Sequence, residues 1–328
     1  MSTQQLVKID SLKIDVRITR SLRLAIVDTA SFDVSKGQIL GMIGESGSGK
    51  TMLCRSLVGT LERRGAYIAS GTLEFEGTSL IGISQDQWRD IRGKKIGYIP
   101  QSALAGPNPV MTIGAQLGEA IRQDRDFPKG KIRERALELL DIVQIRRPEV
   151  VLKQYPNALS GGMKQRVMIA CAIAQNPKLI VADEPTTGLD VTVQAEIMKI
   201  LLDIRKNFHT SIILVSHDLP LINDICDDIV VMHAGSTVEK LPSSEITRSK
   251  HPYTRALYNS RIDLVEPKGK LVTINGQPPT VGKWPLGCKF SERCDFVVEA
   301  CRTPQVIPLF EISPNHSSAC LRYDEIGI

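Results

Sequence analysis

Three short apolar runs, rich in β-branched residues, punctuate the first part of the chain. They lie at 38–43, 178–182 and 211–215, and each leads directly into a polar or glycine-rich turn. Runs that are apolar at nearly every position are typical of parallel strands buried on both faces. After the first run, apolar residues recur at helical spacing over 52–58, which predicts a strand, a loop and a helix. This is the opening βα unit of a doubly wound sheet.

Other stretches follow different patterns. Apolar and polar residues alternate from Leu12 to Ile18, which predicts an antiparallel edge sheet at the N-terminus. Apolar residues spaced three and four apart at 131–144 and 163–175 indicate a helical lobe inserted over about 102–175. From about residue 242 the sequence becomes rich in proline and contains cysteine, with weak periodicity.

We therefore place a domain boundary there, with an α/β domain at 1–242 and an extension at 243–328. The chain has 328 residues, of which 42% are hydrophobic, enough for one large domain and a smaller appendage. Its 41 basic and 36 acidic residues give a net charge of +5, which is too mild to demand a nucleic-acid partner, and none is expected.

No apolar run approaches the roughly 18 to 20 residues of a membrane-spanning helix, and the polar start lacks the apolar core of a signal peptide. We therefore expect a cytoplasmic protein. Its seven cysteines are then free thiols or metal ligands rather than disulfides, because the cytosol is reducing.

A glycine-rich motif follows the first predicted strand. It reads Gly44, Glu45, Ser46, Gly47, Ser48, Gly49, Lys50 and Thr51, and it matches the phosphate-binding P-loop pattern. The glycines let successive backbone N–H groups line a concavity, and the following helix adds its positive N-terminal end. We expect Lys50 to bind the β- and γ-phosphates and the Thr51 hydroxyl to ligate Mg²⁺. The strand and helix context argues against a chance glycine-serine turn.

Two adjacent carboxylates end the second apolar run. Asp183 and Glu184 directly follow the predicted strand at 179–182. A carboxylate at a strand tip beside the P-loop can reach Mg²⁺, so Asp183 is the predicted metal-side acid, and Glu184 is placed to polarise the attacking water. An isolated Asp-Glu pair would more often be a solvated turn.

A third motif lies about twenty residues before that strand, over Leu159 to Arg166. Ser160 is a predicted N-cap, and Gly161 and Gly162 let a phosphate approach the first helical turn. Since the chain already has a P-loop, a second phosphate-seeking helix end makes sense if it serves a neighbour's ATP. Taken alone, the motif could be an ordinary capped helix, but it closely resembles the signature of ABC ATPases.

Further elements of that family appear in their usual order along the chain. Gln101 looks like the Q-loop glutamine, Gly188-Leu189-Asp190 like the D-loop, and His217 like the switch histidine. Met163 replaces the usual signature glutamine, as in the peptide and nickel importer branch. The stretch 14–26 contains none of the aromatic residues that usually stack on adenine.

The resemblance implies an ABC-type P-loop NTPase of the α/β class, with a RecA-like parallel core, an N-terminal antiparallel β subdomain and an inserted helical subdomain. It implies that two such subunits close head to tail around two ATP molecules. Each ATP would face the partner's Ser160-Gly161-Gly162 loop, with Mg²⁺ held through Thr51, Asp183 and Gln101. Gln101, Glu184 and His217 would be the catalytic residues.

Four of the seven cysteines cluster in the extension, as Cys288, Cys294, Cys301 and Cys320. Their surroundings are poor in apolar residues, which suggests that a structural metal site holds this segment together. The spacing lacks the CxxC pairs of common zinc knuckles. Iron–sulfur, zinc and unliganded thiols all stay open on spacing alone. The other three cysteines are scattered in apolar contexts and are most simply core residues.

The extension also carries the stretches 251–257, 274–279 and 287–290, followed by Arg293-Cys294, which resemble the C-terminal extension of the dipeptide, oligopeptide and nickel ATP-binding subunits. In that family the four cysteines are associated with a [4Fe–4S] cluster, with Zn²⁺ as the alternative here.

The resemblance implies an ATPase that energises import of di- and oligopeptides, or alternatively of nickel or a nickel chelate. The implied partners are a second ABC ATPase subunit in a heterodimer, two transmembrane permease subunits and an extracytoplasmic substrate-binding protein. The expected location is peripheral, on the cytoplasmic face of the cell (inner) membrane. A soluble ABC ATPase acting on nucleic acid is the remote alternative, because long heptad insertions are absent and the P-loop and signature each occur once.

Overall fold

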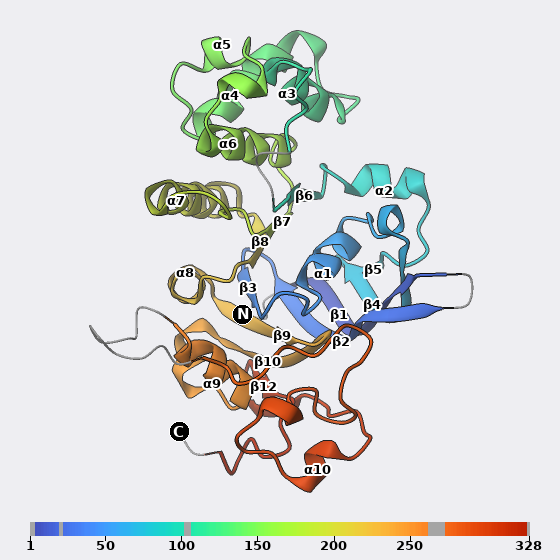
Figure 1. Cartoon of the computed structure of the whole chain (residues 1–328). Coiled ribbons are helices and arrows are strands. Elements are labelled where there is room, and N and C mark those ends of the chain that lie inside the picture. Colours follow the sequence, from blue (N-terminus) through green and yellow to red (C-terminus); the bar gives the residue numbers. More distant parts are fainter. Residues whose placement is uncertain (1–3, 20–21, 102–105, 262–272, 327–328) are drawn as a thin grey trace. The chain divides into compact units, whose positions relative to one another are not determined.

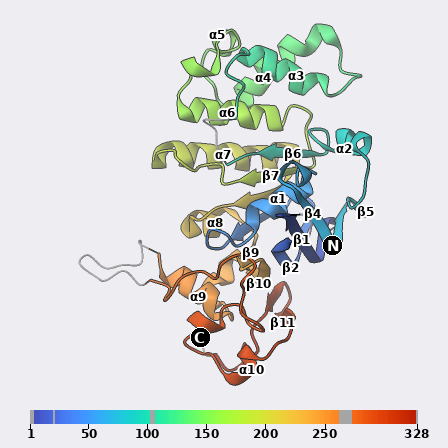
Figure 2. The ribbon, with the colours of Figure 1, turned by 45° about the vertical axis from the view of Figure 1, so that its right-hand side comes forward.

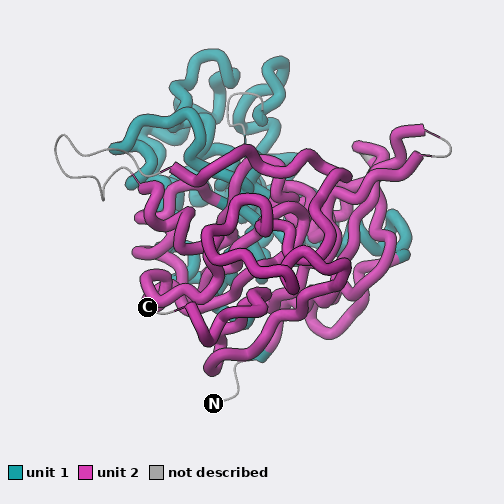
Figure 3. The backbone as a smooth tube through the Cα atoms, turned by 60° about the horizontal axis from the view of Figure 1, so that its bottom comes forward, with its two compact units in different colours: residues 1–4, 35–38, 82–215 teal, residues 5–34, 39–81, 216–328 magenta. Residues whose placement is uncertain are grey.

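The computed structural model describes residues 4–19, 22–101, 106–261 and 273–326, so the start of the helical lobe predicted at 102–175 lies outside the described residues. The chain divides into two compact units, coloured separately in Figure 3. Unit 1 comprises residues 1–4, 35–38 and 82–215, and unit 2 comprises residues 5–34, 39–81 and 216–328. Within the described ranges, every helix is too short or too polar to cross a membrane.

Unit 2 contains a mixed sheet whose strands follow the order β5-β4-β1-β2-β10-β9-β3. The β1–β4, β4–β5 and β9–β10 pairs are antiparallel, whereas β2–β10 and β3–β9 are parallel. The antiparallel N-terminal part agrees with the alternation in the sequence. The bounds are β1 Gln5–Arg17, β2 Arg23–Ser35, β3 Ile39–Ile43, β4 Ala66–Phe75, β5 Thr78–Ser79, β9 Asp228–His233 and β10 Ser236–Pro242.

A bulge in β1 reverses the alternation of its buried side chains. Val7 and Ile9 are buried before the bulge, and Leu12 and Ile14 are buried after it. The backbone of Ser11 has a φ of 49°, and the register with β4 shifts here. On β4, a Cβ added to Gly71 would lie 2.4 Å from the carbonyl oxygen of Ser11, so only glycine fits there.

The extension continues the sheet of unit 2. Its strand β12 (His316–Ser318) pairs antiparallel with both β10 and β11 (Phe310–Ser313). Figure 1 shows α9 and α10 on the same side of β10 as β12. The remaining elements of unit 2 are α1 Lys50–Leu57, η1 Glu62–Arg64, α8 Leu219–Ile225, η4 Ser243–Arg248, α9 Pro252–Asn259, η6 Ser291–Arg293 and α10 Glu299–Arg302. The domain boundary at 242 stays a prediction.

Unit 1 contains three parallel strands in the order β8-β7-β6. Every residue of β7 and β8 is buried, as the continuous apolar runs predict. Helices α3, α4, α5 and α6 gather into one cluster in Figure 2. The bounds are α2 Gln85–Ile91, β6 Ile96–Ile99, α3 Ile113–Arg122, η2 Lys129–Lys131, α4 Ile132–Ile142, α5 Pro148–Val151, η3 Pro156–Ala158, α6 Gly161–Ala172, β7 Leu179–Asp183, α7 Val191–Phe208 and β8 Ser211–Val215.

Among the buried histidines of unit 2, His233 and His251 each have 1% of their surface exposed. The Nδ1 atom of His251 accepts a hydrogen bond at 3.1 Å from the backbone N–H of Tyr253, so the histidine caps α9. Burial lowers the pKa of His251 to about 3, with a further lowering by His233. Burial likewise lowers the pKa of His233 to about 4. Both rings are therefore neutral at pH 7.

These histidines predict a loss of stability in mild acid. Between pH 6.5 and about 4 the unfolded chain binds more protons than the folded chain, so the free energy of unfolding falls as pH falls through this window. His251→Asn keeps a capping acceptor but does not titrate. In urea unfolding, the free energy of unfolding of His251→Asn should fall less over this pH window than that of the native chain. The difference should be on the order of 3 kcal/mol. An equal loss in both chains would contradict the assignment.

Candidate functional site

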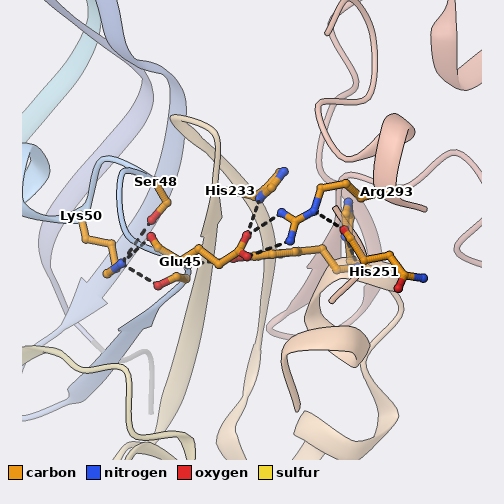
Figure 4. A network of polar contacts seen from close by, with 9 residues as sticks. Glu45, Ser48, Lys50, His233, His251 and Arg293 are labelled. Atoms are coloured by element: carbon orange, nitrogen blue, oxygen red, sulfur yellow. Dashed lines mark hydrogen bonds and ion pairs between the residues drawn. The ribbon is translucent and has the colours of Figure 1, made fainter. Parts of the chain in front are cut away.

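The predicted phosphate loop connects β3 to α1 in unit 2. Gly49 precedes the helix with a φ of 101°, and no side chain caps the helix there. The positive end of the helix dipole is thus left available for an anion. The ammonium of Lys50 donates to the carbonyl oxygens of Gly44 at 2.7 Å and Glu45 at 3.0 Å, and to the Ser48 hydroxyl at 3.3 Å (Figure 4). Loop and lysine therefore form one compact cationic cradle.

The start of this loop is packed against β9. Gly44 has a φ of 147°, and a Cβ built on it would lie 2.1 Å from the carbonyl oxygen of Met232. Any side chain at Gly44 would clash with the backbone of Met232, which is held in strand β9. Further along the loop, the backbone N–H of Gly235 donates to the carbonyl oxygen of Ser48 at 3.1 Å. The loop is therefore held by its neighbours as well as by its own turns.

The predicted acids lie at the end of β7 in unit 1. Asp183 is 1% exposed, and the Tyr98 hydroxyl donates to its Oδ2 atom at 3.3 Å. Glu184 has a φ of 51°, a strained conformation for a residue other than glycine. Its Oε2 atom accepts hydrogen bonds from the Gln101 amide at 2.8 Å and the Thr187 hydroxyl at 2.9 Å. The structure thus brings together Gln101 and Glu184, which are 83 residues apart.

The signature segment forms the start of α6. The Ser160 hydroxyl accepts a hydrogen bond from the backbone N–H of Met163 at 3.3 Å, which confirms the predicted N-cap. Asp190 does the same for α7, where its carboxylate accepts from the backbone N–H of Val193 at 3.0 Å. From the sequence we assigned Asp190 only to the D-loop. Its capping role could have been predicted, because an aspartate directly before a helix is a common N-cap.

The predicted site residues divide between the two units. The P-loop and the exposed His217, which precedes α8, belong to unit 2, whereas Gln101, Asp183, Glu184 and the signature residues belong to unit 1. The catalytic, magnesium-binding and partner-facing roles of these residues stay predictions.

Sequence reasoning assigned no role in the P-loop to the extension, yet two of its basic residues bind near that loop. Arg293 forms an ion pair with Glu45. The ammonium of Lys289 donates to Asp28 at 2.8 Å, to the carbonyl oxygen of Ala234 at 3.0 Å and to the Ser236 hydroxyl at 2.8 Å. No sequence signal local to the P-loop indicates either interaction.

The four cysteines of the extension, Cys288, Cys294, Cys301 and Cys320, line one pocket. Burial raises the pKa of the Cys288 thiol to about 12 and that of Cys320 to about 11, and it also raises the pKa of Cys294. Each of these three sulfurs is hydrogen-bonded to the backbone of the residue two positions later.

Within the described ranges, no three His, Cys, Asp or Glu side chains come close enough together to share one metal ion. A tetrahedral zinc site would place its sulfurs only about 3.8 Å apart. The four thiols therefore converge on one pocket without forming the tight set that a single ion requires.

Comparisons with known proteins agree with this geometry. Residues 27–187 match the family model described as ABC transporter, and residues 238–301 match the one described as oligopeptide/dipeptide transporter, C-terminal region. The dimeric ATP-binding cassette MJ0796 in a post-hydrolysis state with ADP and Pi has a TM-score of 0.65 at 24% identity, covering 73% of this chain and 99% of that chain. The structure of cbiO1 from Clostridium perfringens has a TM-score of 0.64 at 24% identity, with 75% and 92% covered.

These solved structures establish the class, an ABC-type P-loop fold. The sequence relatives narrow it. The oligopeptide transport ATP-binding protein AppD of Bacillus subtilis is 39% identical, covering 92% of each chain. The dipeptide transport ATP-binding protein DppD of Haemophilus influenzae is 42% identical, covering 84% of each. The chain belongs to the ATP-binding proteins of the oligopeptide and dipeptide ABC transporters, which confirms the resemblance seen in its motifs.

The contact between Gly44 and Met232 predicts unequal effects of two alanine substitutions in the loop. Both Gly44 and Gly47 have positive φ, but a Cβ on Gly47 would have no atom within 4 Å. Gly47→Ala should lower the free energy of unfolding by about 1 kcal/mol, and Gly44→Ala by at least about 3 kcal/mol, because strain and a backbone clash add. Urea denaturation of both variants checks this. An equal loss in the free energy of unfolding for both variants would show that Gly44 does not lie against the Met232 carbonyl oxygen.

Proposed function

We propose that this chain is the ATP-hydrolysing subunit that energises an importer of di- and oligopeptides. The observation that carries the proposal is one chain holding a P-loop between β3 and α1, a capped signature helix α6, and an extension that matches the oligopeptide/dipeptide transporter C-terminal region. A P-loop kinase or GTPase has no use for the signature segment.

The residues divide the phosphoryl-transfer chemistry among themselves. Lys50 and the loop N–H groups would bind the β- and γ-phosphates, and Thr51, Asp183 and Gln101 would hold Mg²⁺, which would neutralise charge on the phosphates. Glu184 orients and polarises the attacking water. Its hydrogen bonds with Gln101 and Thr187 fix the direction of its carboxylate, as a residue that positions a nucleophile requires. His217 contributes at the transferring phosphate.

A second ATPase subunit completes each site in this proposal. Ser160 caps α6, so the helix begins at Gly161 with its positive dipole end directed at whatever anion approaches it. That anion is the ATP of the partner subunit, which pairs as a heterodimer. Two transmembrane permease subunits and an extracytoplasmic binding protein complete the importer, and the ATPases work on the cytoplasmic face of the membrane. Differential binding of ATP to the closed pair shifts the permeases between conformations.

We also propose that the four-cysteine pocket holds a [4Fe–4S] cluster with a structural role. The observation that supports a cluster is that four thiols line one pocket. Backbone hydrogen bonds to Cys288, Cys294 and Cys320 are what buried thiolates on a cluster need. Binding would release the protons that the raised pKa values retain.

Replacing the proposed water-positioning acid tests the assignment of function. Glu184→Gln should retain ATP binding within about threefold but lower turnover at least about a hundredfold, because it removes general-base chemistry and keeps size and shape. Uptake of labelled di- and oligopeptides should fall to background in cells carrying Glu184→Gln. Glu149→Gln, an exposed acid-to-amide control, should leave uptake unchanged.

Radioactive nickel uptake is measured in the same cells. Loss of nickel uptake alone would transfer the protein to the metal-importing branch with the same mechanism. Undiminished uptake of both substrates in Glu184→Gln would contradict the importer assignment.

Metal analysis of the chain purified without oxygen tests the cluster. About four iron and four sulfide per chain are expected, with visible charge-transfer absorption. Cys288→Ser should lose iron, whereas Cys226→Ser, which replaces a buried cysteine outside the pocket, should retain it. Zinc in place of iron would support the zinc alternative, and a metal-free chain would leave the thiols unliganded.

A further inference from the structure

Glu45, the second residue of the P-loop, is bound by a residue of the extension. The Nη1 atom of Arg293 donates to Oε2 of Glu45 at 2.7 Å, and Nη2 donates to Oε1 at 2.8 Å (Figure 4). The side chains are 5% and 21% exposed, respectively. Two parallel, largely buried hydrogen bonds fix both the distance and the orientation of the carboxylate.

The backbone of the same loop residue is also held from the extension. The N–H of Glu45 donates to the hydroxyl of Tyr253 at 2.8 Å, and Tyr253 is fully buried. The Tyr253 ring packs against those of His233 at 4.3 Å and Phe290 at 5.3 Å between centroids. Arg293 thus binds the side chain of Glu45, while Tyr253, packed in an aromatic cluster, binds its main chain.

Arg293 is itself fixed. Its Nε atom donates to the carbonyl oxygen of Asn275 at 2.8 Å, and its guanidinium lies 5.6 Å from the centroid of the Phe290 ring. It ends the short helix η6, directly before Cys294 of the four-cysteine pocket. The guanidinium therefore reaches the P-loop from a structured base.

The charge of Glu45 makes this contact consequential for nucleotide binding. A carboxylate within a phosphate-binding loop repels the polyphosphate that the loop has to receive. Burial alone would raise the pKa of Glu45, but the hydrogen bonds and charge of Arg293, helped by a hydrogen bond with Tyr253, hold it below its usual value. Glu45 is therefore ionised at neutral pH, and Arg293 is the cation that neutralises it.

We propose that Arg293 is a positioning residue of the nucleotide site, which holds the P-loop through Glu45 and cancels the negative charge that Glu45 brings to the phosphates. The extension is then part of the ATP site rather than an appendage to it. The proposal rests on the nucleotide-binding role of the loop.

Titration of the full chain with MgATP tests the proposal. Arg293→Gln should weaken binding at least about tenfold at low salt, because Glu45 is left uncompensated beside the phosphates. Raising the salt concentration should reduce the difference in MgATP affinity between Arg293→Gln and the native chain, since screening weakens like-charge repulsion. Adding Glu45→Gln to Arg293→Gln should restore affinity to within about threefold of native, because the repelling charge is gone. A purely structural role for Arg293 predicts no such rescue.

Two controls keep the outcomes distinct. Arg302→Gln, at an exposed position in the extension, should bind like the native chain. Native-like binding by Arg293→Gln, or a folded double variant no tighter than the single one, overturns the proposal. If Arg293→Gln alone does not fold, MgATP binding by the double variant and by Arg293→Lys decides. A folded double variant that binds MgATP about tenfold more weakly than the native chain overturns the proposal. Equal binding by native and Lys50→Ala would instead count against the P-loop assignment itself.

Discussion

A loop that binds phosphates through its backbone N–H groups cannot use those same groups to hold its own shape. Contacts with neighbouring segments therefore have to hold part of its conformation, and unit 2 supplies several of them. The Met232 carbonyl presses against Gly44 where no side chain fits, and the Gly235 N–H holds the carbonyl of Ser48. Glu45 is held by Arg293 and Tyr253 of the extension. Contacts with Met232 and Gly235 and contacts with the extension thus hold the loop together.

The same constraint explains why the extension is polar where it meets the loop. A buried ion pair costs desolvation energy and is a poor device for stability alone. The pair of Arg293 and Glu45 is better explained as a means of positioning the loop and neutralising its carboxylate. Both carboxylate oxygens accept hydrogen bonds, and the guanidinium is itself held by the carbonyl oxygen of Asn275. The neighbouring His233 and His251 stay neutral, so Arg293 carries the compensating charge within this ring cluster. In unit 1, the positive φ of Glu184 is a comparable local cost at the position proposed to orient the attacking water.

Local signals made much of the fold and part of the site predictable. Continuous apolar runs located β7 and β8, because strands buried on both faces need apolar residues throughout. The chemistry of Ser160 located the start of α6. The P-loop pattern located the turn between β3 and α1, where each restricted position has its own geometric reason. The family assignment followed from these motifs and was confirmed by the comparisons.

The rest depended on contacts between distant parts of the chain. Arg293 and Glu45 are 248 residues apart, and no periodicity in the sequence relates them. The β1 bulge at Ser11 is accommodated by Gly71, which belongs to another strand, so the change in alternation could not be interpreted from β1 alone. Cysteine spacing could not separate iron–sulfur from zinc, because the choice depends on how closely the sulfurs approach in three dimensions.

The most direct test of the central claim, that the loop from Gly44 to Thr51 receives nucleotide phosphates on its backbone, is amide hydrogen exchange of that segment in the full chain. Exchange should slow across the segment when MgATP is added to the native chain, and it should not change when MgATP is added to Lys50→Ala. Unchanged exchange in the native chain at saturating MgATP would contradict a phosphate site in this loop.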